Sequence, residues 1–503
     1  MTSNNKLNIL VIMSDQHNHK ITGCYGDTAV RTPNIDGLAA GGMRFSNTYC
    51  PAPICVPSRM SFMSGRRPHE NRVMDNFDIL SSRIITWPEK LKGAGYHTAL
   101  IGRMHFEGPD QFHGFETTLE ELRHWRGNKP VRNQEESVRV PNGSYWSPRE
   151  SVEDLSGKGT TFVQFRDETV TDSGCSFLRR EAERGERPFA AVIGLYNPHP
   201  PYVGKKDLFD YYYKKIDVPD EDLSLMPGYL KNFYSTYRNW ENPGPINPEA
   251  KRRARAAYYA NCEHMDQQAG RILRTLNETG LAENTLVIYT SDHGDMLGKF
   301  GAWGKGSLYE DSARVPMIVS LPGVVPAGSV CGAAVNLRDL GNTFCEIAGA
   351  PKLNKSDAPS LWPYIQGKTP DGSEETESEL YQRAGSFGGR DDALFKMVRR
   401  GPWKCWCYRI GEEMHFSLYN IEKDPEERND LISDPDCSQT AEELKNRLLL
   451  NWDSARIMED ARERMTDRAE LDRSWHTYWL HAGYPVPQDL DSDVETVHAK
   501  GLL

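Results

Sequence analysis

Two pairs of residues in the sequence combine an acid with a second side chain that can bind a metal. Asp15 and Gln16 directly follow the first apolar run of the chain. Asp292 and His293 directly follow a second run, which is rich in β-branched residues. Carboxylate and amide oxygens suit a hard divalent cation, and imidazole suits several other divalent ions. Aspartate also forms turns without any metal, so one pair alone would be ambiguous. Two such pairs favour a divalent cation site.

Two histidines and a lysine lie in comparable positions and are candidates for proton transfer. His105 and His199 each follow a strand-like run, in the segments Gly-Arg-Met-His-Phe and Asn-Pro-His-Pro-Pro. Lys305 lies between two glycines, which leave room for a backbone or a ligand to approach closely. Imidazole and ammonium groups can exchange protons with a reacting substrate. Structural or surface histidines and a solvated loop lysine are the alternative interpretation.

The elements that must position these residues alternate between strands and helices through the first three quarters of the chain. Apolar, β-branched-rich runs predict buried strands over residues 7–13, 97–102, 189–196 and 285–290. Helices are predicted over 32–39 and 250–278. This order predicts an α/β fold with a large, mostly parallel central sheet flanked by helices. Ligands bind such sheets beyond the carboxyl ends of the strands, and the candidate residues lie there.

The character of the sequence changes after about residue 375. Strands are predicted over 395–399, 404–410 and 416–421, followed by a charged helix from 441 to about 473 and a tail. Cys405, Trp406 and Cys407 are expected to alternate between the two faces of a strand. We therefore predict a catalytic domain over residues 1–375 and a smaller C-terminal α+β domain, built on an antiparallel sheet, over 376–503. Residues 120–160 are expected to form a long loop.

Composition excludes several classes of function. The formal net charge is −11 and the isoelectric point is about 5.8, which argues against nucleic acid as a partner. The sequence contains no run of 18 apolar residues, so no transmembrane helix and no membrane partner are expected. The polar amino terminus lacks the pattern of a signal peptide, and the ten cysteines include no C-x-x-C pair. We predict a cytoplasmic protein with reduced cysteines.

One further motif makes the combination specific. Cys55 begins the segment Cys-Val-Pro-Ser-Arg, and a Gly-Arg pair follows Arg59 six residues later. Together with the acidic pairs, this motif resembles the signature of type I, formylglycine-dependent sulfatases of the alkaline phosphatase superfamily. The resemblance extends over nearly the whole chain. Residues 309–316, Tyr-Glu-Asp-Ser-Ala-Arg-Val-Pro, support it, and residues 418–425, Leu-Tyr-Asn-Ile-Glu-Lys-Asp-Pro, resemble the closing motif of the family.

The resemblance implies a sulfuric ester hydrolase and a particular chemistry. A formylglycine-generating (sulfatase-maturing) enzyme would convert Cys55 to formylglycine, whose hydrated aldehyde attacks sulfur and forms a sulfo-enzyme intermediate. One divalent cation, usually calcium, with magnesium and manganese as alternatives, would be bound by five side chains, namely Asp15, Gln16, Cys55, Asp292 and His293. The remaining catalytic residues around the sulfate group would be Arg59, His105, His199 and Lys305.

The resemblance also implies roles for individual side chains. His199 or Lys305 would protonate the departing alcohol, and His105 would take a proton from the second hydroxyl of the diol so that sulfate leaves. Arg103, Asn76 and Trp125 are expected to contact the substrate. For Trp125, which could face a cationic group together with His124, packing on the protein core is an equally good interpretation.

The sequence departs from the family pattern at three of these positions. Gln16, His293 and Arg103 stand where many members have Asp, Asn and Lys. The first two recur in the choline-sulfatase-like branch, which Asp75-Asn76 and residues 104–116 also resemble, although the C-terminal tail does not. We therefore expect hydrolysis of a small organic or saccharide sulfate by a homo-oligomer. The alternatives are a phosphonate monoester or phosphodiester hydrolase, a choline-sulfatase proper, and a non-enzymatic binder with unmodified Cys55.

Overall fold

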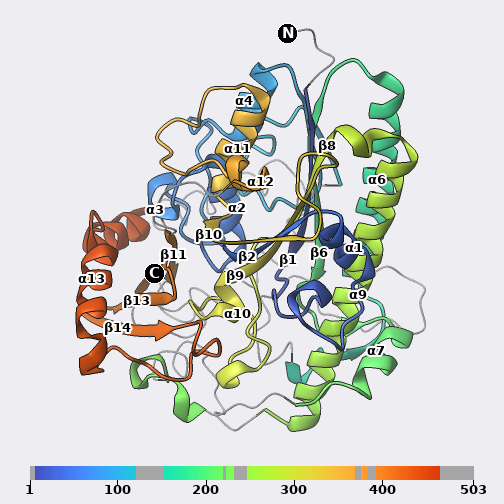
Figure 1. The fold of residues 1–503 in the computed structure, drawn as a ribbon. Helices are drawn as coiled ribbons and strands as arrows, with labels where there is room; N and C mark the ends of the chain where they lie inside the picture. Colours follow the sequence, from blue (N-terminus) through green and yellow to red (C-terminus); the bar gives the residue numbers. More distant parts are fainter. Residues whose placement is uncertain are drawn as a thin grey trace, which may run out of the picture.

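The computed structural model describes residues 6–120, 152–218, 223–231, 246–368, 375–382 and 392–464. Within these ranges the chain forms a large sheet with helices on both faces and a smaller sheet beside it (Figure 1). The large sheet has eight strands, in the order β10 (Ser329–Asn336), β2 (Met43–Tyr49), β9 (Arg314–Ser320), β8 (Thr285–Ser291), β1 (Asn8–Asp15), β6 (Phe189–Pro198), β3 (His97–Gly102) and β4 (Thr117–Leu119).

The central strand β1 shows why its sequence forms a strand here. All eight of its residues are buried, and it pairs in parallel with β6 and with β8. Its side chains alternate between two apolar cores, with Ile9, Val11 and Met13 in one and Leu10 and Ile12 in the other. A strand covered on both faces needs apolar residues at consecutive positions, which is the reason for its unbroken apolar run.

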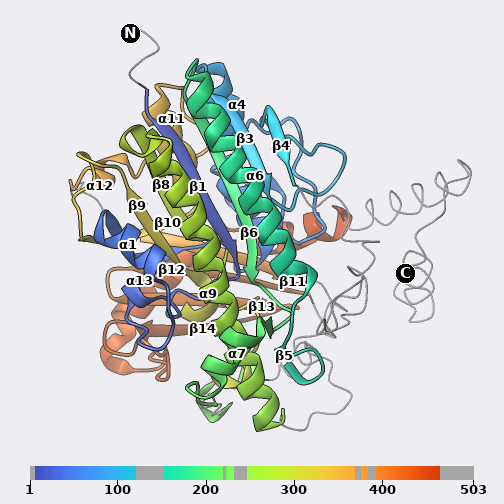
Figure 2. The same ribbon diagram turned by 90° about the vertical axis from the view of Figure 1, so that its right-hand side faces the viewer.

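Helices cover both faces of the large sheet (Figure 2). One face is covered by α1 (Pro33–Ala40), α6 (Phe162–Arg184) and α9 (Pro248–Glu278), and the other by α2 (Cys55–Ser64), α4 (Trp87–Gly93) and α11 (Asp339–Ala348). Shorter elements are α3 (Pro68–Asn71), α7 (Lys206–Tyr213), α10 (Glu310–Ala313), α12 (Trp362–Ile365) and the paired strands β5 (Gly157–Lys158) and β7 (Val203–Gly204). Across the described ranges, every helix is too short or too polar to span a bilayer.

The predicted α/β architecture is confirmed. The four predicted strands correspond to β1, β3, β6 and β8, and the two predicted helices to α1 and α9. The sheet is mostly parallel, but β9 runs antiparallel to both of its neighbours. The other four strands of this sheet, β2, β4, β9 and β10, were not predicted. Partly exposed positions interrupt the apolar pattern of β2 and β10, and Pro316 lies within β9, where a proline argues against a strand.

The smaller sheet is an antiparallel meander of β11 (Glu375–Gln382), β12 (Ala393–Arg400), β13 (Trp403–Ile410) and β14 (Glu413–Asn420). The three predicted strands are β12, β13 and β14, whereas the polar sequence of β11 gave no signal. On β13, Trp406 packs against Tyr309 of the larger unit, while Cys405 and Cys407 face the helix α13 (Ser438–Leu449). The predicted alternation of these three residues is confirmed. The domain boundary near residue 375 stays a prediction.

The predicted charged helix from 441 to about 473 is wrong as a single element. The chain forms α13 and then a second helical segment over 454–464, and residues from 465 onward lie outside the described ranges. Leu450 has extended backbone angles, and Asn451 has a φ of 56°, so the helix ends there. Charge pattern alone does not reveal such a break, because both segments carry the same kind of residues.

A buried ion cluster joins the two sheets. Lys404 of β13 donates from Nζ to Glu310 at 2.7 Å and to Glu427 at 2.8 Å, and Tyr49 of β2 also donates to Glu310. The three charged side chains are at most 2% exposed. Burial alone would raise the pKa of Glu310, but Lys404 and Arg314 outweigh burial and lower this pKa below its usual range. The ammonium group of Lys404 therefore compensates two buried carboxylates at the junction of the sheets.

We expect Lys404→Met to destabilise the protein strongly. The substitution keeps much of the side-chain volume but removes the cation that Glu310 and Glu427 share. Among the described residues, only Arg314 then still pairs with Glu310, and only Lys299 with Glu427. Loss of a buried ion-pair partner should lower the free energy of unfolding by about 3–5 kcal/mol. Urea unfolding followed by circular dichroism measures this change. The control is Lys423→Met, which alters an exposed lysine and should change stability by less than about 0.5 kcal/mol. Equal unfolding midpoints for the two variants would contradict the prediction.

Candidate active site

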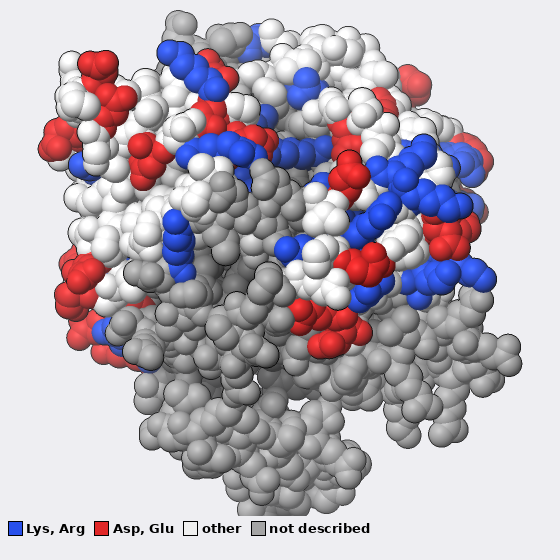
Figure 3. Space-filling view, turned by 90° about the horizontal axis from the view of Figure 1, so that it is seen from below, with Lys and Arg blue, Asp and Glu red and all other residues white. Residues whose placement is uncertain are grey.

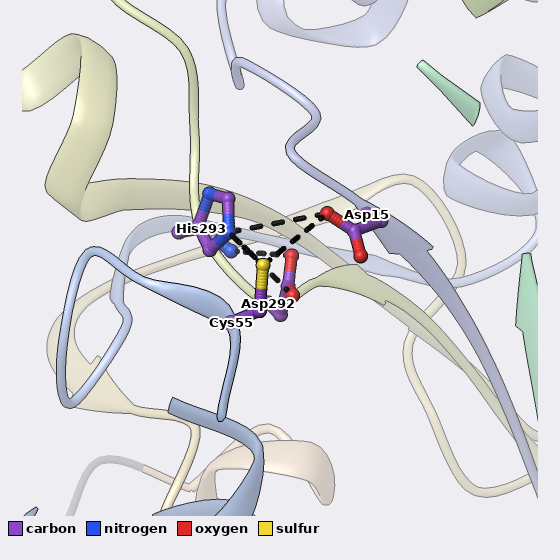
Figure 4. Close-up of side chains that lie close together, drawn as sticks. All are labelled: Asp15, Cys55, Asp292 and His293. Carbon is purple, nitrogen blue, oxygen red and sulfur yellow. Dashed lines mark hydrogen bonds and ion pairs between the residues drawn. The ribbon is translucent and has the colours of Figure 1, made fainter. Parts of the chain in front are cut away.

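The site lies where two neighbouring strands of the large sheet end. Asp15 is the last residue of β1, and Asp292 directly follows β8. These strands are in register up to the residue before each acid, so the two acids lie side by side. Figure 4 shows their carboxylates beside the side chains of Cys55 and His293. One ligand atom from each of these four buried residues lies within 4.8 Å of the other three. The structure thus brings the two predicted acidic pairs together.

Cys55 is the first residue of α2, so the amino-terminal end of this helix lies at the site. The residue before it makes no side-chain cap, and Asn76 takes over that role by accepting a bond at Oδ1 from the backbone N–H of Val56 at 2.9 Å. Ser58 donates from Oγ to the carbonyl of Asp292 at 2.6 Å and fixes the helix to the end of β8. The dipole of the helix favours an anionic group at Cys55.

Arg59 lies one turn further along α2 and is completely buried. Its Nε donates to Asp292 at 2.8 Å, its Nη2 donates to Asp15 at 3.1 Å, and its Nη1 donates to the backbone carbonyl of Arg103. One buried cation thus bridges two buried carboxylates, neither of which could be buried alone at low cost. Burial and the Cys55 thiolate would raise the pKa of Asp15. Arg103, His199 and Arg59 together outweigh them and hold this pKa well below its usual range.

Arg103 supplies a second cation just beyond β3. It donates from Nε to Asp15 and from Nη2 to Nδ1 of His105 at 2.8 Å, and its guanidinium carbon lies 4.5 Å from the ring centre of Tyr196. A guanidinium group can only donate, so Nδ1 of His105 accepts and the neutral ring carries its proton on Nε2. Burial and Arg103 lower the pKa of His105 to about 4, and this ring is therefore neutral at neutral pH.

Polar groups surround the sulfur atom of Cys55. Nζ of Lys305 lies 2.9 Å from Sγ and Nε2 of His293 lies 3.3 Å from it, and the side chains of His105 and His199 lie nearby. Burial alone would raise the pKa of the thiol, but Lys305 and His293 outweigh burial and hold this pKa well below its usual value. The position is therefore built to stabilise an anion, as an activated nucleophile requires.

His199 and His293 have the opposite tautomer to His105. Nδ1 of His199 lies 2.7 Å from the carbonyl of Pro200, and Nδ1 of His293 lies 3.0 Å from the carbonyl of Gly294. A carbonyl can only accept, so each ring has its proton on Nδ1 and, when neutral, presents a lone pair on Nε2 to the site. His199 can then take or give a proton, and His293 can bind a metal through Nε2.

The donor set fits a divalent cation. Asp15 and Asp292 supply carboxylates, and His293 supplies Nε2. Oε1 of Gln16 is buried and has no hydrogen-bond partner among the described residues, so coordination to a cation would satisfy it. Burial would lower the pKa of His293, but Asp292 outweighs burial and raises this pKa. A proton and a cation therefore compete for the same nitrogen atom.

Of the residues predicted to contact the substrate, some lie in the site and others lie outside the described residues. Trp125 and His124 lie outside the described residues, as does most of the predicted loop over 120–160. Asn76 uses its Oδ1 to cap α2, and its contact with the substrate stays a prediction. Arg103 lies in the site, bonded to Asp15 and stacked on an aromatic ring.

Two residues that shape the site, Asp295 and Tyr196, were not predicted from the sequence. Asp295 accepts a bond from Nε2 of Gln16 at 2.6 Å, and Tyr196 provides the ring beneath Arg103. Asp295 was visible as the last residue of the segment Ser-Asp-His-Gly-Asp, and Tyr196 as the last residue of the predicted strand over 189–196. Neither carried a signal of its own, because each acts only through a contact distant in sequence.

The charge of the site differs from the charge of the whole chain. Figure 3 views the molecule from the side at which β1 and β8 end, and on its described surface the lysines and arginines lie interspersed with acidic residues. Within the site, by contrast, Arg59, Arg103 and Lys305 lie around the two carboxylates and Cys55. A small anion can therefore be bound by a protein whose net charge is −11.

Comparison with known proteins agrees with this chemistry. Residues 7–350 match the sulfatase family, and residues 298–453 match the C-terminal region of N-sulphoglucosamine sulphohydrolase. The choline-sulfatase of Rhizobium meliloti (strain 1021) is 31% identical over 452 residues, which cover 86% of this chain and 83% of that protein. Arylsulfatase K of Danio rerio is 28% identical over 459 residues, covering 88% and 84% of the two chains.

Solved structures show the same fold. A 2-O GAG sulfatase matches with a TM-score of 0.70 at 24% identity and covers 91% of this chain and 94% of its own. The phosphonate monoester hydrolase of Agrobacterium radiobacter also matches with a TM-score of 0.70, at 21% identity, and covers 88% and 95%. The match to the family extends over most of the chain, from β1 to the end of α11. The chain therefore belongs to the sulfatase family of the alkaline phosphatase superfamily and is a sulfuric ester hydrolase.

Proposed function

We propose that this sulfatase hydrolyses a small organic or saccharide sulfate monoester to an alcohol and inorganic sulfate, with Cys55 converted to formylglycine. The position of Cys55 supports the proposal most directly, because it begins α2 and lies 2.9 Å from Lys305, in contact with His293. The hydrated aldehyde would supply the nucleophilic oxygen, and its second hydroxyl would allow sulfate to leave. The proposal requires a formylglycine-generating enzyme as a partner. The predicted homo-oligomer and cytoplasmic location stay predictions.

The proposed cation is calcium, with magnesium or manganese as alternatives. Its ligands would be Asp15, Gln16, Asp292, His293 and the modified Cys55. When bound there, it would lower the cost of ionising the nucleophile and neutralise charge on the sulfate oxygens. The oxygen donors favour calcium, whereas the imidazole of His293 increases the affinity for manganese.

The remaining cations bind and orient the sulfate group in this proposal. Lys305 contacts the position of the nucleophile directly, and its ammonium group can also donate to a sulfate oxygen. Arg103 has a fixed guanidinium plane, because it is bonded to Asp15 and stacked on Tyr196. Cations fixed before the reaction stabilise the developing charge without further reorganisation. Arg59 acts mainly by holding the two carboxylates in place.

Two proton transfers complete the proposed reaction. His199 or Lys305 protonates the departing alcohol, because Lys305 contacts the sulfur of Cys55 and His199 lies near it. His105 takes the proton of the second hydroxyl, under one condition that the structure imposes. Arg103 now donates to Nδ1 and the ring proton is on Nε2, so this bond must be released and the ring proton must move to Nδ1 before Nε2 of His105 can accept a proton. Until then His105 acts as a hydrogen-bond donor toward the nucleophile.

A panel of esters tests the proposed activity. Purified enzyme is assayed with choline sulfate, an aryl sulfate, sugar sulfates, a phosphonate monoester and a phosphodiester, first with calcium and then with a chelator. We expect sulfate esters to be hydrolysed fastest, and activity to disappear with chelator and return with calcium. Faster hydrolysis of the phosphonate ester would favour the phosphonate monoester hydrolase alternative. Choline sulfate as the best substrate would identify a choline-sulfatase proper.

We expect Cys55→Ser to abolish multiple turnover. Serine retains an oxygen nucleophile but has no second hydroxyl to expel sulfate, so the enzyme should remain covalently sulfated, which intact mass spectrometry detects. In protein from its native host, conversion to formylglycine should lower the mass of the wild type by about 18 Da. Cys437→Ser, outside the site, is the control and should retain turnover. Full turnover by Cys55→Ser would rule out this mechanism, and an unmodified wild-type thiol would favour a binding protein.

The general acid can be identified from the dependence on the leaving group. Removal of the acid should slow hydrolysis of an alkyl sulfate by about 10²–10⁴-fold, because an alkoxide needs a proton in order to leave. It should slow hydrolysis of a nitrophenyl sulfate much less. We therefore expect one of the variants His199→Gln and Lys305→Met to show this selective loss. The other should affect both substrates alike, and equal losses for both substrates in both variants would contradict the assignment.

A further inference from the structure

Asp295 is a buried carboxylate beside the site that none of the roles above uses. It is 0% exposed. Its Oδ2 accepts from Nε2 of Gln16 at 2.6 Å and from the hydroxyl of Tyr202 at 2.8 Å. Its Oδ1 accepts from the backbone N–H groups of Leu297 at 2.9 Å and of Gly304 at 3.0 Å. Each oxygen thus accepts two bonds, and one of the four donors is a residue of the proposed cation site.

The bond to Asp295 determines which end of the Gln16 amide faces the carboxylate. An ionised carboxylate can only accept, so the donor Nε2 must point toward it and Oε1 must point away. Oε1 is the atom left buried without a partner among the described residues. If the amide turned over, the site would instead be offered an N–H group, which repels a cation. The orientation of this one amide therefore decides whether residue 16 can bind a metal.

The backbone of Gln16 is fixed independently of its side chain. Its N–H donates to Asp292 at 3.0 Å, and its carbonyl accepts from the hydroxyl of Tyr258 at 2.6 Å. Its φ of 66° lies in the left-handed region, which non-glycine residues adopt only when their surroundings impose it. With the backbone held in this way, the freedom that remains to Gln16 is rotation about its side-chain bonds, and the bond to Asp295 restricts the orientation of the amide.

We propose that Asp295 is a positioning residue that orients the Gln16 amide so that Oε1 is offered to the cation. This inference rests on the proposed cation site. A carboxylate at position 16 would present an oxygen in either orientation. A glutamine has one acceptor end and one donor end, so Gln16 needs an acceptor that orients its amide. Asp295 meets that need by accepting from Nε2.

The variant Asp295→Asn tests this proposal. The new amide can still accept at one end from the N–H groups of Leu297 and Gly304, but its other end now donates toward Gln16. The Gln16 amide must then turn and present Nε2 to the cation site. We expect calcium to bind about 10–100-fold more weakly. The readout is the rise in unfolding temperature of the purified enzyme as calcium is added without substrate, with circular dichroism as the check on folding.

A double variant separates orientation from a general structural effect. In Gln16→Glu/Asp295→Asn, one carboxylate oxygen at position 16 accepts from the new amide and the other faces the cation, so calcium affinity should return close to the wild-type value. Gln16→Glu alone places two carboxylates at hydrogen-bond distance and should bind calcium less tightly than the double variant. Tyr202→Phe removes a different bond to the same Oδ2 and should leave calcium affinity nearly unchanged.

The possible outcomes are distinct. Wild-type calcium affinity in Asp295→Asn would overturn the proposal, as would a folded double variant that binds calcium as weakly as the single variant. If Asp295→Asn does not fold, the calcium affinities of the double variant and of Gln16→Glu still test the proposal. A wild-type enzyme whose unfolding temperature does not respond to calcium would instead refute the cation site itself.

Discussion

The guanidinium group of Arg59, buried between Asp15 and Asp292, is the interaction on which the site depends. The three charges come from α2, β1 and the segment after β8, so their pairing fixes the relative position of a helix and two strands. Each carboxylate would be costly to bury without its cation. Cys55 lies four residues before Arg59, on the same side of α2. The ion pairs that stabilise the fold at this point therefore also set the distance between the nucleophile position and the proposed cation ligands.

This arrangement explains how an acidic protein can act on an anionic ester. The net charge of −11 is spread over the whole chain, where solvent and salt screen it. In the buried site, Arg59, Arg103 and Lys305 face Asp15 and Asp292, and charges interact more strongly there than they do in water. These three cations exceed the two carboxylates by one positive charge, which the ionised nucleophile can compensate, and a divalent cation would add further positive charge. The negative charge of a bound sulfate group would compensate the remaining positive charge. These cations can therefore bind sulfate, because the carboxylates of the protein do not neutralise them fully.

Much of this site followed from the sequence because the central strands are buried on both faces. Their unbroken apolar runs revealed where the strands end, and Asp15, His199 and Asp292 lie just at or beyond those ends. Strands with partly exposed positions, such as β2 and β10, left no such pattern and were missed. The resemblance to sulfatases implied that Arg59 belongs to the site, but only the structure shows that Arg59 bridges two carboxylates. Asp295 was missed for the same reason, because its role exists only through contacts that folding creates.

Two residues at the strand ends also show how backbone conformation serves the site. Gln16 and His105 have φ values of 66° and 61°, in a region that costs a non-glycine residue roughly 1–2 kcal/mol. In both cases a bond from the site compensates, because Asp292 accepts from the N–H of Gln16 and Arg103 donates to the ring of His105. The left-handed turns change the direction of the chain just beyond the sheet. The charged groups of the site hold those turns, so the same side chains that would bind the substrate also maintain the backbone that positions them.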